Sequence, residues 1–97
     1  MRTYSVAKIL RAVDGDTFDI NIDLGFSIYH LVRIRIKGID TEELNDPDPV
    51  KAAKAFAQKA FAQKLEGKLC SVDIHHTDKY GRWESDLFVD GIKYVGI

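Results

Sequence analysis

The chain has 97 residues, with 14 Lys and Arg against 15 Asp and Glu, so its formal net charge at pH 7 is -1. This length allows one domain with a single core and is too short for two. A composition of 45% apolar and 30% charged residues is typical of a soluble globular protein and argues against disorder. The balanced charge excludes an overall basic surface, so any bound nucleic acid must meet a local group of cations.

The N-terminus and the cysteine content bear on the location of the protein. The first ten residues, MRTYSVAKIL, contain no apolar stretch of the length that a signal peptide needs, and no later segment approaches a membrane span. We therefore expect no membrane partner and a cytoplasmic location by default, although a secreted form is not excluded. The single cysteine, Cys70, cannot form an internal disulfide, and we expect it in the core because it lies in an alternating apolar run.

The first third of the chain is predicted to form three β-strands. A strand over residues 5–13 leads into the turn-forming pair Asp14-Gly15, and residues 18–24 then alternate between apolar and polar side chains. A third strand is expected at roughly Tyr29–Ile39. Two strands that flank an Asp-Gly pair are typical of a hairpin.

A helix is predicted after these strands, over residues 50–66. Asp48 is expected to cap it, Pro49 suits its first turn, and Gly67 supplies the stop. The pentapeptide AFAQK occurs twice within it, which we interpret as a local duplication. At about 100° per residue the apolar positions spread over about half of the circumference. We expect this face to close one end of a barrel, through Phe56, Ala57, Ala60, Phe61 and Leu65.

The last third is predicted to contain a strand that begins at Cys70, a turn at Tyr80-Gly81, a strand at about Trp83–Val89 and a short return strand at Ile92–Val95. The order βββαββ with turns every 8 to 12 residues favours a mainly β protein with one helix (α+β). We expect one domain over residues 1–97, a five-stranded barrel of the oligonucleotide-binding (OB) type.

Three short motifs carry candidate chemistry, and each has a structural explanation when taken alone. Residues 14–17, DGDT, are more often a hairpin turn than a metal site. Residues 39–43, IDTEE, could be a strand end with a solvated acidic loop, and residues 78–82, DKYGR, could be another turn.

All three motifs in this order, separated by strands of this length, resemble the staphylococcal nuclease-like (thermonuclease) family. The third strand ends with the pattern R-x-x-G-I-D-T-x-E, and the resemblance runs from about Val6 to Gly91. It implies an OB-fold barrel that hydrolyses phosphodiester bonds of DNA or RNA by metal-assisted attack of water, with one calcium ion as cofactor.

The resemblance implies that the carboxylates of Asp16 and Asp40 and the backbone carbonyl of Thr41 bind the calcium ion. The chemistry agrees, because calcium takes about 6 to 8 oxygen ligands in a loose geometry. Two carboxylates, a carbonyl, the substrate phosphate and waters can fill that shell, and neither histidine nor cysteine is required.

The resemblance also implies roles in catalysis and substrate binding. Glu43 matches the acid that positions or deprotonates the attacking water, and Arg35 and Arg82 match two phosphate-binding arginines. Lys79 and Tyr80 match positions that help to hold the substrate phosphate. Two guanidinium groups can grip a phosphate bidentately as its oxygens gain negative charge, which ammonium groups cannot do.

The third strand raises a geometric problem for this site. Arg35 and Asp40 are five residues apart, so in a regular strand their side chains would point to opposite faces. We therefore predict a bend or bulge at Gly38. Arg33 and Lys37 share the face of Arg35, and we interpret them as solvated or phosphate-steering rather than catalytic.

The chain departs from the family at two points. The family usually has proline where this chain has Glu42, which puts the rigidity of the loop in question. The family fold also continues into C-terminal helical structure, whereas this chain ends at Ile97. Either the chain is a shortened form, or a partner such as a second copy of the chain covers the exposed barrel face.

Two other interpretations stay open. A non-catalytic module of this fold would bind nucleic acid or a protein partner without cutting, although the complete set of matched residues favours the nuclease. The acids and arginines could also form only an ion-pair network on the barrel rim. Trp83 is expected to pack in the barrel, with base stacking as the alternative.

Overall fold

In the computed structural model, which describes residues 1–97, strands β1 (Arg2–Asp14), β2 (Thr17–Gly25) and β3 (Ile28–Ile36) form an antiparallel meander. Alternate apolar side chains of these strands are buried and the polar ones between them are more exposed. This alternation follows from the two-residue period of a strand with one face in a core. The predicted strands are therefore confirmed, although β1 begins earlier than residue 5 and β3 ends at Ile36 instead of near Ile39.

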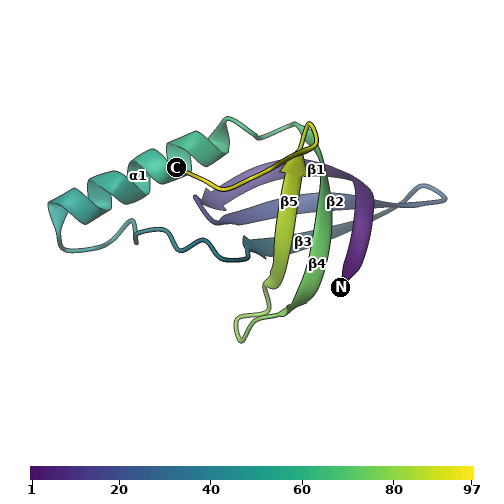
Figure 1. The fold of residues 1–97 in the computed structure, drawn as a ribbon, viewed down its shortest axis with the longest axis horizontal. Helices are drawn as coiled ribbons and strands as arrows, with labels where there is room; N and C mark the ends of the chain where they lie inside the picture. Colours follow the sequence, from purple (N-terminus) through teal and green to yellow (C-terminus); the bar gives the residue numbers. More distant parts are fainter.

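A second group of strands, β4 (Leu69–Thr77), β5 (Trp83–Val89) and the short β6 (Ile92–Lys93), completes the sheet. The strand order is β3-β2-β1-β4-β5-β6, and β3 also pairs in parallel with β5, from Ile34 opposite Trp83 to Ile36 opposite Ser85. This pairing closes the five long strands into a barrel (Figure 1). The predicted α+β class and OB-type barrel are confirmed, and the order βββαββ holds for the five long strands, which the short β6 follows.

The long strand β1 takes part in both sides of the barrel. Residues 2–8 pair with β4 and residues 7–14 pair with β2, with register shifts along both pairings. Such irregularities bend a strand and increase its twist, which a closed barrel requires. The sixteen buried residues of the core fill the interior, and Cys70 is among them as predicted.

Helix α1 (Pro49–Gln63) is capped by Asp48, whose Oδ1 accepts a hydrogen bond from Val50 N at 2.9 Å. The predicted cap is therefore present. The helix ends at Gln63 rather than at Glu66, and a turn follows up to Gly67, which has a positive φ of 84°. Gly67 N then donates to Ile9 O at 2.7 Å, which ties the end of the helix to β1.

The helix face that packs on the barrel differs from the predicted one. Ala55, Gln58 and Ala62 are buried, Phe61 and Leu65 are half-buried, but Phe56, with 71% of its surface exposed, lies outside the contact. Ala57 and Ala60 are exposed as well. The helix reaches beyond the barrel in Figure 1, and the barrel is met by Ala55, Gln58 and Ala62, with Phe61 and Leu65 partly buried against the core. No helix of the structure has the length and apolar character needed to cross a membrane.

Candidate functional site

The turn between β1 and β2 presents the first acids of the site. Asp14 pairs with Thr17, so the turn itself is formed by Gly15 and Asp16. A Cβ on Gly15 would lie 2.9 Å from both Gln58 Cβ and Thr41 Cγ2, which is closer than side chains approach. Glycine is therefore required here by close packing against the helix and the loop after β3.

Asp16 is only 8% exposed, and its carboxylate is held from three directions. Thr17 Oγ1 donates to its Oδ1 at 3.0 Å, Thr41 N donates to its Oδ2 at 3.4 Å, and Arg35 Nη2 lies 3.6 Å from the same Oδ2. A buried carboxylate needs such partners, because burial disfavours an unpaired charge. The turn, β3 and the following loop thus meet at one side chain.

The end of β3 explains how the side chains of Arg35 and Asp40 reach the same side of the chain. The strand stops at Ile36, and Gly38 adopts a positive φ of 81° in a turn, a conformation that glycine adopts without steric cost. The predicted bend is therefore at Gly38, but it is a turn beyond the strand and not a bulge within it. Arg35 Nη2 donates to Ile39 O at 3.0 Å and to the Asp40 carboxylate, so both side chains serve one site.

The loop that carries Glu43 is fixed to the helix. Glu42 N donates to Gln58 Oε1 at 3.1 Å, and Gln58 is a buried polar residue on α1. A proline at position 42 would lack this N–H. The hydrogen bond therefore restrains the loop at Glu42, the position where the staphylococcal nuclease-like family that the sequence resembles usually has proline.

The β4–β5 loop is ordered by its own aspartate. Asp78 Oδ1 accepts from Tyr80 N at 2.9 Å and from Arg82 N at 3.0 Å, and Asp78 Oδ2 accepts from Arg82 Nε at 2.8 Å. Although desolvation acts to raise it, these hydrogen bonds and the charge of Arg82 lower the pKa of Asp78. The guanidinium carbon of Arg82 lies 5.3 Å from the centre of the Tyr80 ring, and Lys79 Nζ lies 5.2 Å from it.

These segments enclose a polar cleft of about 210 Å³. The predicted site residues Asp16, Arg35, Asp40, Thr41, Glu43 and Arg82 all line it. The other two, Lys79 and Tyr80, do not, and Tyr80 lies beside Arg82 with its ring largely exposed. The complete lining consists of Asp14, Asp16, Arg35, Asp40, Thr41, Glu42, Glu43, Leu44 and Arg82.

Negative charge is concentrated in the cleft. Burial raises the pKa of Asp14, and the negative charges of Asp16 and Glu43 raise it further, while Lys59 and Arg82 act in the opposite direction. Burial together with the charge of Asp16 also raises the pKa of Tyr94, to about 12. A cation in the cleft would relieve this repulsion.

The donor atoms of the cleft are those that a hard cation prefers. Asp16, Asp40 and Glu43 offer carboxylate oxygens, and no histidine or cysteine lines the cleft. No group of three or more His, Cys, Asp or Glu side chains is arranged to hold a metal ion by itself. In this structure the Arg35 guanidinium contacts both Asp16 and Asp40, so their charges are balanced by an arginine.

Four residues of the site had no role in the sequence analysis: Asp14, Gln58, Asp78 and Tyr94. Asp14 and Asp78 belong to the motifs DGDT and DKYGR. Their acidic side chains beside Asp16 and Arg82 could therefore have indicated that they belong to the site. Gln58 was counted as a helix former, and Tyr94 lies in the predicted return strand. Tyr94 OH donates to Gly15 O at 2.6 Å, although the two residues are 79 positions apart in the sequence. No local sequence pattern could predict this contact.

The chain has a partial similarity to a known protein. No family model matches the chain. The chain is similar to Protein ParB of Escherichia coli, with 30% identity over 83 residues, which are 86% of this chain. The aligned part is 41% of that protein, so the chain spans less than half of the length of this relative.

Proposed function

We propose that the cleft hydrolyses phosphodiester bonds of DNA or RNA, as a calcium-dependent nuclease of the staphylococcal nuclease-like type. One observation carries the proposal: three separate segments bring two arginines and five acids into a single cleft of about 210 Å³. An acid and a phosphate-binding cation within one cleft are the groups that hydrolysis of a phosphodiester needs.

Arg35 and Arg82 would bind the phosphate. Their guanidinium groups come from the end of β3 and from the loop before β5, and both face the cleft. Asp78 fixes Arg82 through Nε, which leaves the terminal nitrogens of its guanidinium for a ligand. Removal of one such electrostatic donor typically costs about 2.7 to 4 kcal/mol of barrier.

Glu43 would act as the general base. It accepts a proton from the attacking water, the water oxygen bonds to phosphorus, and the bond from phosphorus to the leaving ester oxygen breaks. The leaving oxygen takes its proton from solvent, so the products are a phosphate monoester and a free hydroxyl. A positioned general base contributes roughly 10²- to 10⁴-fold.

The residues present fit a calcium ion by donor type, with Asp16 and Asp40 as carboxylate ligands and Thr41 as the carbonyl ligand. When bound, calcium supplies positive charge beside the phosphate and the attacking water. Arg35 contacts both aspartates in this structure, and we expect its guanidinium to be released for the phosphate when the carboxylates take up the ion.

The test is cleavage of a single-stranded DNA oligonucleotide with calcium and then with excess chelator. We expect calcium-dependent cleavage by the chain and a loss of roughly 10²-fold or more in Glu43→Gln. Asp90→Asn is the matched control, because Asp90 is an exposed acid outside the cleft whose positive φ of 53° asparagine also tolerates. Cleavage that persists in chelator, or that Glu43→Gln leaves unchanged, would contradict the mechanism.

A second candidate function is a binding module of the same fold, which acts on no bond. The contact of Arg35 with both aspartates favours it, because this arginine supplies positive charge beside the two carboxylates. Binding of single-stranded DNA that weakens with salt, without turnover in any divalent cation, would support the module and exclude the nuclease.

A further inference from the structure

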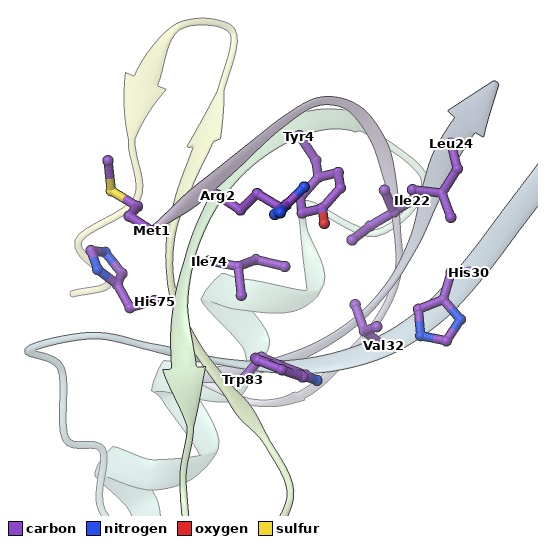
Figure 2. A pocket seen from close by; sticks show the side chains of 10 residues that line it. All are labelled: Met1, Arg2, Tyr4, Ile22, Leu24, His30, Val32, Ile74, His75 and Trp83. Carbon is purple, nitrogen blue, oxygen red and sulfur yellow. The ribbon is translucent and has the colours of Figure 1, made fainter.

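The open end of the barrel contains a second cavity, which we call the barrel-mouth pocket. Its volume is about 550 Å³, within the range of roughly 300 to 1,000 Å³ that is usual for ligand sites. Figure 2 shows Tyr4 and Trp83 on opposite sides of the opening, with Ile74 and Val32 nearer the interior. The lining residues are Met1, Arg2, Tyr4, Ile22, Leu24, His30, Val32, Ile74, His75 and Trp83.

The lining of the pocket combines aromatic surface with positive charge. Seven of its ten residues are apolar, the other three are Arg2, His30 and His75, and no acidic residue is among them. His75 Nε2 is held by Asp86 Oδ2 at 3.0 Å, whereas Arg2 forms no ion pair. Figure 2 shows the Arg2 side chain extending into the opening. The pocket is therefore complementary to a flat apolar ring that carries a negative group.

The pocket and the polar cleft are both lined by residues at the seam between β3 and β5. Trp83 lines the pocket, and its neighbour Arg82 lines the cleft. On the opposite strand Ile34 pairs with Trp83, and the next residue, Arg35, lines the cleft. The two sites are therefore lined by neighbouring residues of the same seam.

The exposure of Trp83 distinguishes it from a core residue. Ser85, Leu87 and Val89, the next inward positions of β5, are at most 9% exposed, whereas Trp83 is 39% exposed. The prediction that Trp83 packs in the barrel is thus only partly met, because the residue forms the rim of an open pocket.

We propose that the barrel-mouth pocket binds a nucleobase of single-stranded nucleic acid against Trp83, while Arg2 meets an adjacent phosphate. This inference rests on the proposed function of the cleft and adds the substrate class, because a base in a duplex is not free to enter. Stacking of bases on aromatic side chains beside cations is a usual mode of single-strand binding. A purely apolar ligand would desolvate Arg2 without giving its charge a partner.

Trp83 is the single tryptophan of the chain, so its fluorescence reports on this pocket. The titration uses the Glu43→Gln variant without divalent cations, so that the oligonucleotide stays intact. The probes are a deoxythymidine octamer and an abasic octamer with the same number of phosphates. We expect saturable quenching with the thymidine octamer and little with the abasic one. Equal signals from the two, or no signal, would overturn the proposal.

A second measurement uses the fluorescence anisotropy of dye-labelled thymidine octamer, in the same Glu43→Gln background. Trp83→Ala should weaken binding roughly 5- to 100-fold, as expected for the loss of one stacked base, and Trp83→Phe should restore most of the affinity. The matched control is Tyr29→Ala, which removes an exposed aromatic residue of β3 outside the pocket and should leave the affinity unchanged.

Arg2→Gln keeps the test valid if Trp83→Ala fails to fold. It should reduce the slope of log affinity against log salt by about 1, as for one lost phosphate contact. An unchanged slope would count against the proposal.

The inference and the proposed function can fail separately. Calcium-dependent cleavage with the same KM in Trp83→Ala as in the unmodified chain overturns the pocket and keeps the nuclease. Quenching specific to bases without any cleavage keeps the pocket and overturns the nuclease.

Discussion

At the scale of single residues, Gln58 is the most informative member of the site. It is a buried amide whose Oε1 accepts from Glu42 N, and its Cβ lies where a side chain on Gly15 would have to go. It therefore contacts the two loops that carry Asp16 and Glu43. Glu42, which in the sequence was only a missing proline, is in the structure the donor to this amide.

We predict that Gln58→Met destabilises the chain by about 1 to 3 kcal/mol, because the Glu42 N–H loses its acceptor in a partly buried position. Cleavage by the same variant should fall in kcat more than in KM, since the loop of Glu43 loses its restraint. Urea unfolding and steady-state kinetics measure the two effects. Gln63→Met, on an exposed position of the same helix, serves as the control. A Gln58→Met variant with unchanged stability would exclude the restraint.

Arg35 is the residue on which the phosphate-binding hypothesis depends most. Its guanidinium contacts Asp16, Ile39 O and Asp40 through Nη2, which a single ammonium cannot reproduce with the same geometry. We predict that Arg35→Lys reduces kcat/KM roughly 10²-fold or more, although the charge is retained. The comparison with Arg33→Lys decides the case, because Arg33 pairs with Asp19 outside the cleft and should tolerate the change.

At the scale of elements, the duplicated pentapeptide of α1 offers two phenylalanines in the same local sequence. Phe61 is half-buried and lies 6.3 Å from Tyr94 between ring centres, whereas Phe56 is mostly exposed. We predict that Phe61→Ala costs about 1 to 3 kcal/mol, because the ring is only partly buried, and that Phe56→Ala stays within about 0.5 kcal/mol. Thermal unfolding of the two variants tests this, and equal losses would mean that the outer face of the helix is also covered.

The strands and the helix differ in how much of their structure the sequence predicts. The strands were predictable, because burial on one face imposes a two-residue period that a single chain displays. The helix was predictable from its cap and its composition, but its packed face was not. The apolar pattern predicted that Phe56 is buried, whereas the fully buried helix residues are Ala55, Gln58 and Ala62, and Phe61 and Leu65 are partly buried. Which helix residues are buried depends on how far the barrel surface extends along the helix, and the sequence pattern of the helix does not contain this information.

The residues of the candidate site also fall into those that the sequence could predict and those that it could not. Asp16, Arg35, Asp40, Thr41, Glu43 and Arg82 could be proposed from motifs, because their spacing relative to turns is local, and the structure brings all six to one cleft. Gln58 and Tyr94 could not, since their hydrogen bonds to Glu42 and Gly15 exist only after the barrel closes. The end of β3 was predicted near Ile39, but the apolar alternation of Val32, Ile34 and Ile36 stops where the strand stops.

At the scale of the whole molecule, Tyr94 connects the end of the chain to the turn of Asp16. Its pKa is raised to about 12, mainly by burial, so the folded chain keeps the phenol protonated above the pH at which the unfolded chain ionises it. This contribution to stability is therefore complete below about pH 10, the ordinary pKa of tyrosine, and is lost as the pH rises toward the folded value.

We predict that Tyr94→Phe lowers stability at pH 7 by about 0.5 to 1.5 kcal/mol, because the hydrogen bond to Gly15 O is lost. The variant should also lose less stability than the unmodified chain between pH 10 and 12. Urea unfolding across this pH range measures both effects. Tyr29→Phe, at an exposed tyrosine, is the control. Parallel pH curves for Tyr94→Phe and the unmodified chain would show that Tyr94 is not the titrating group.

The same hydrogen bond bears on the order in which the protein becomes complete during translation. The turn at Gly15 leaves the ribosome before Tyr94, which is synthesised 79 residues later. Domains form from the N-terminus as the chain emerges, at about 5 to 20 residues per second. The turn of Asp16 can therefore form in the nascent chain, but its last anchor arrives only when nearly all of these 97 residues have been made.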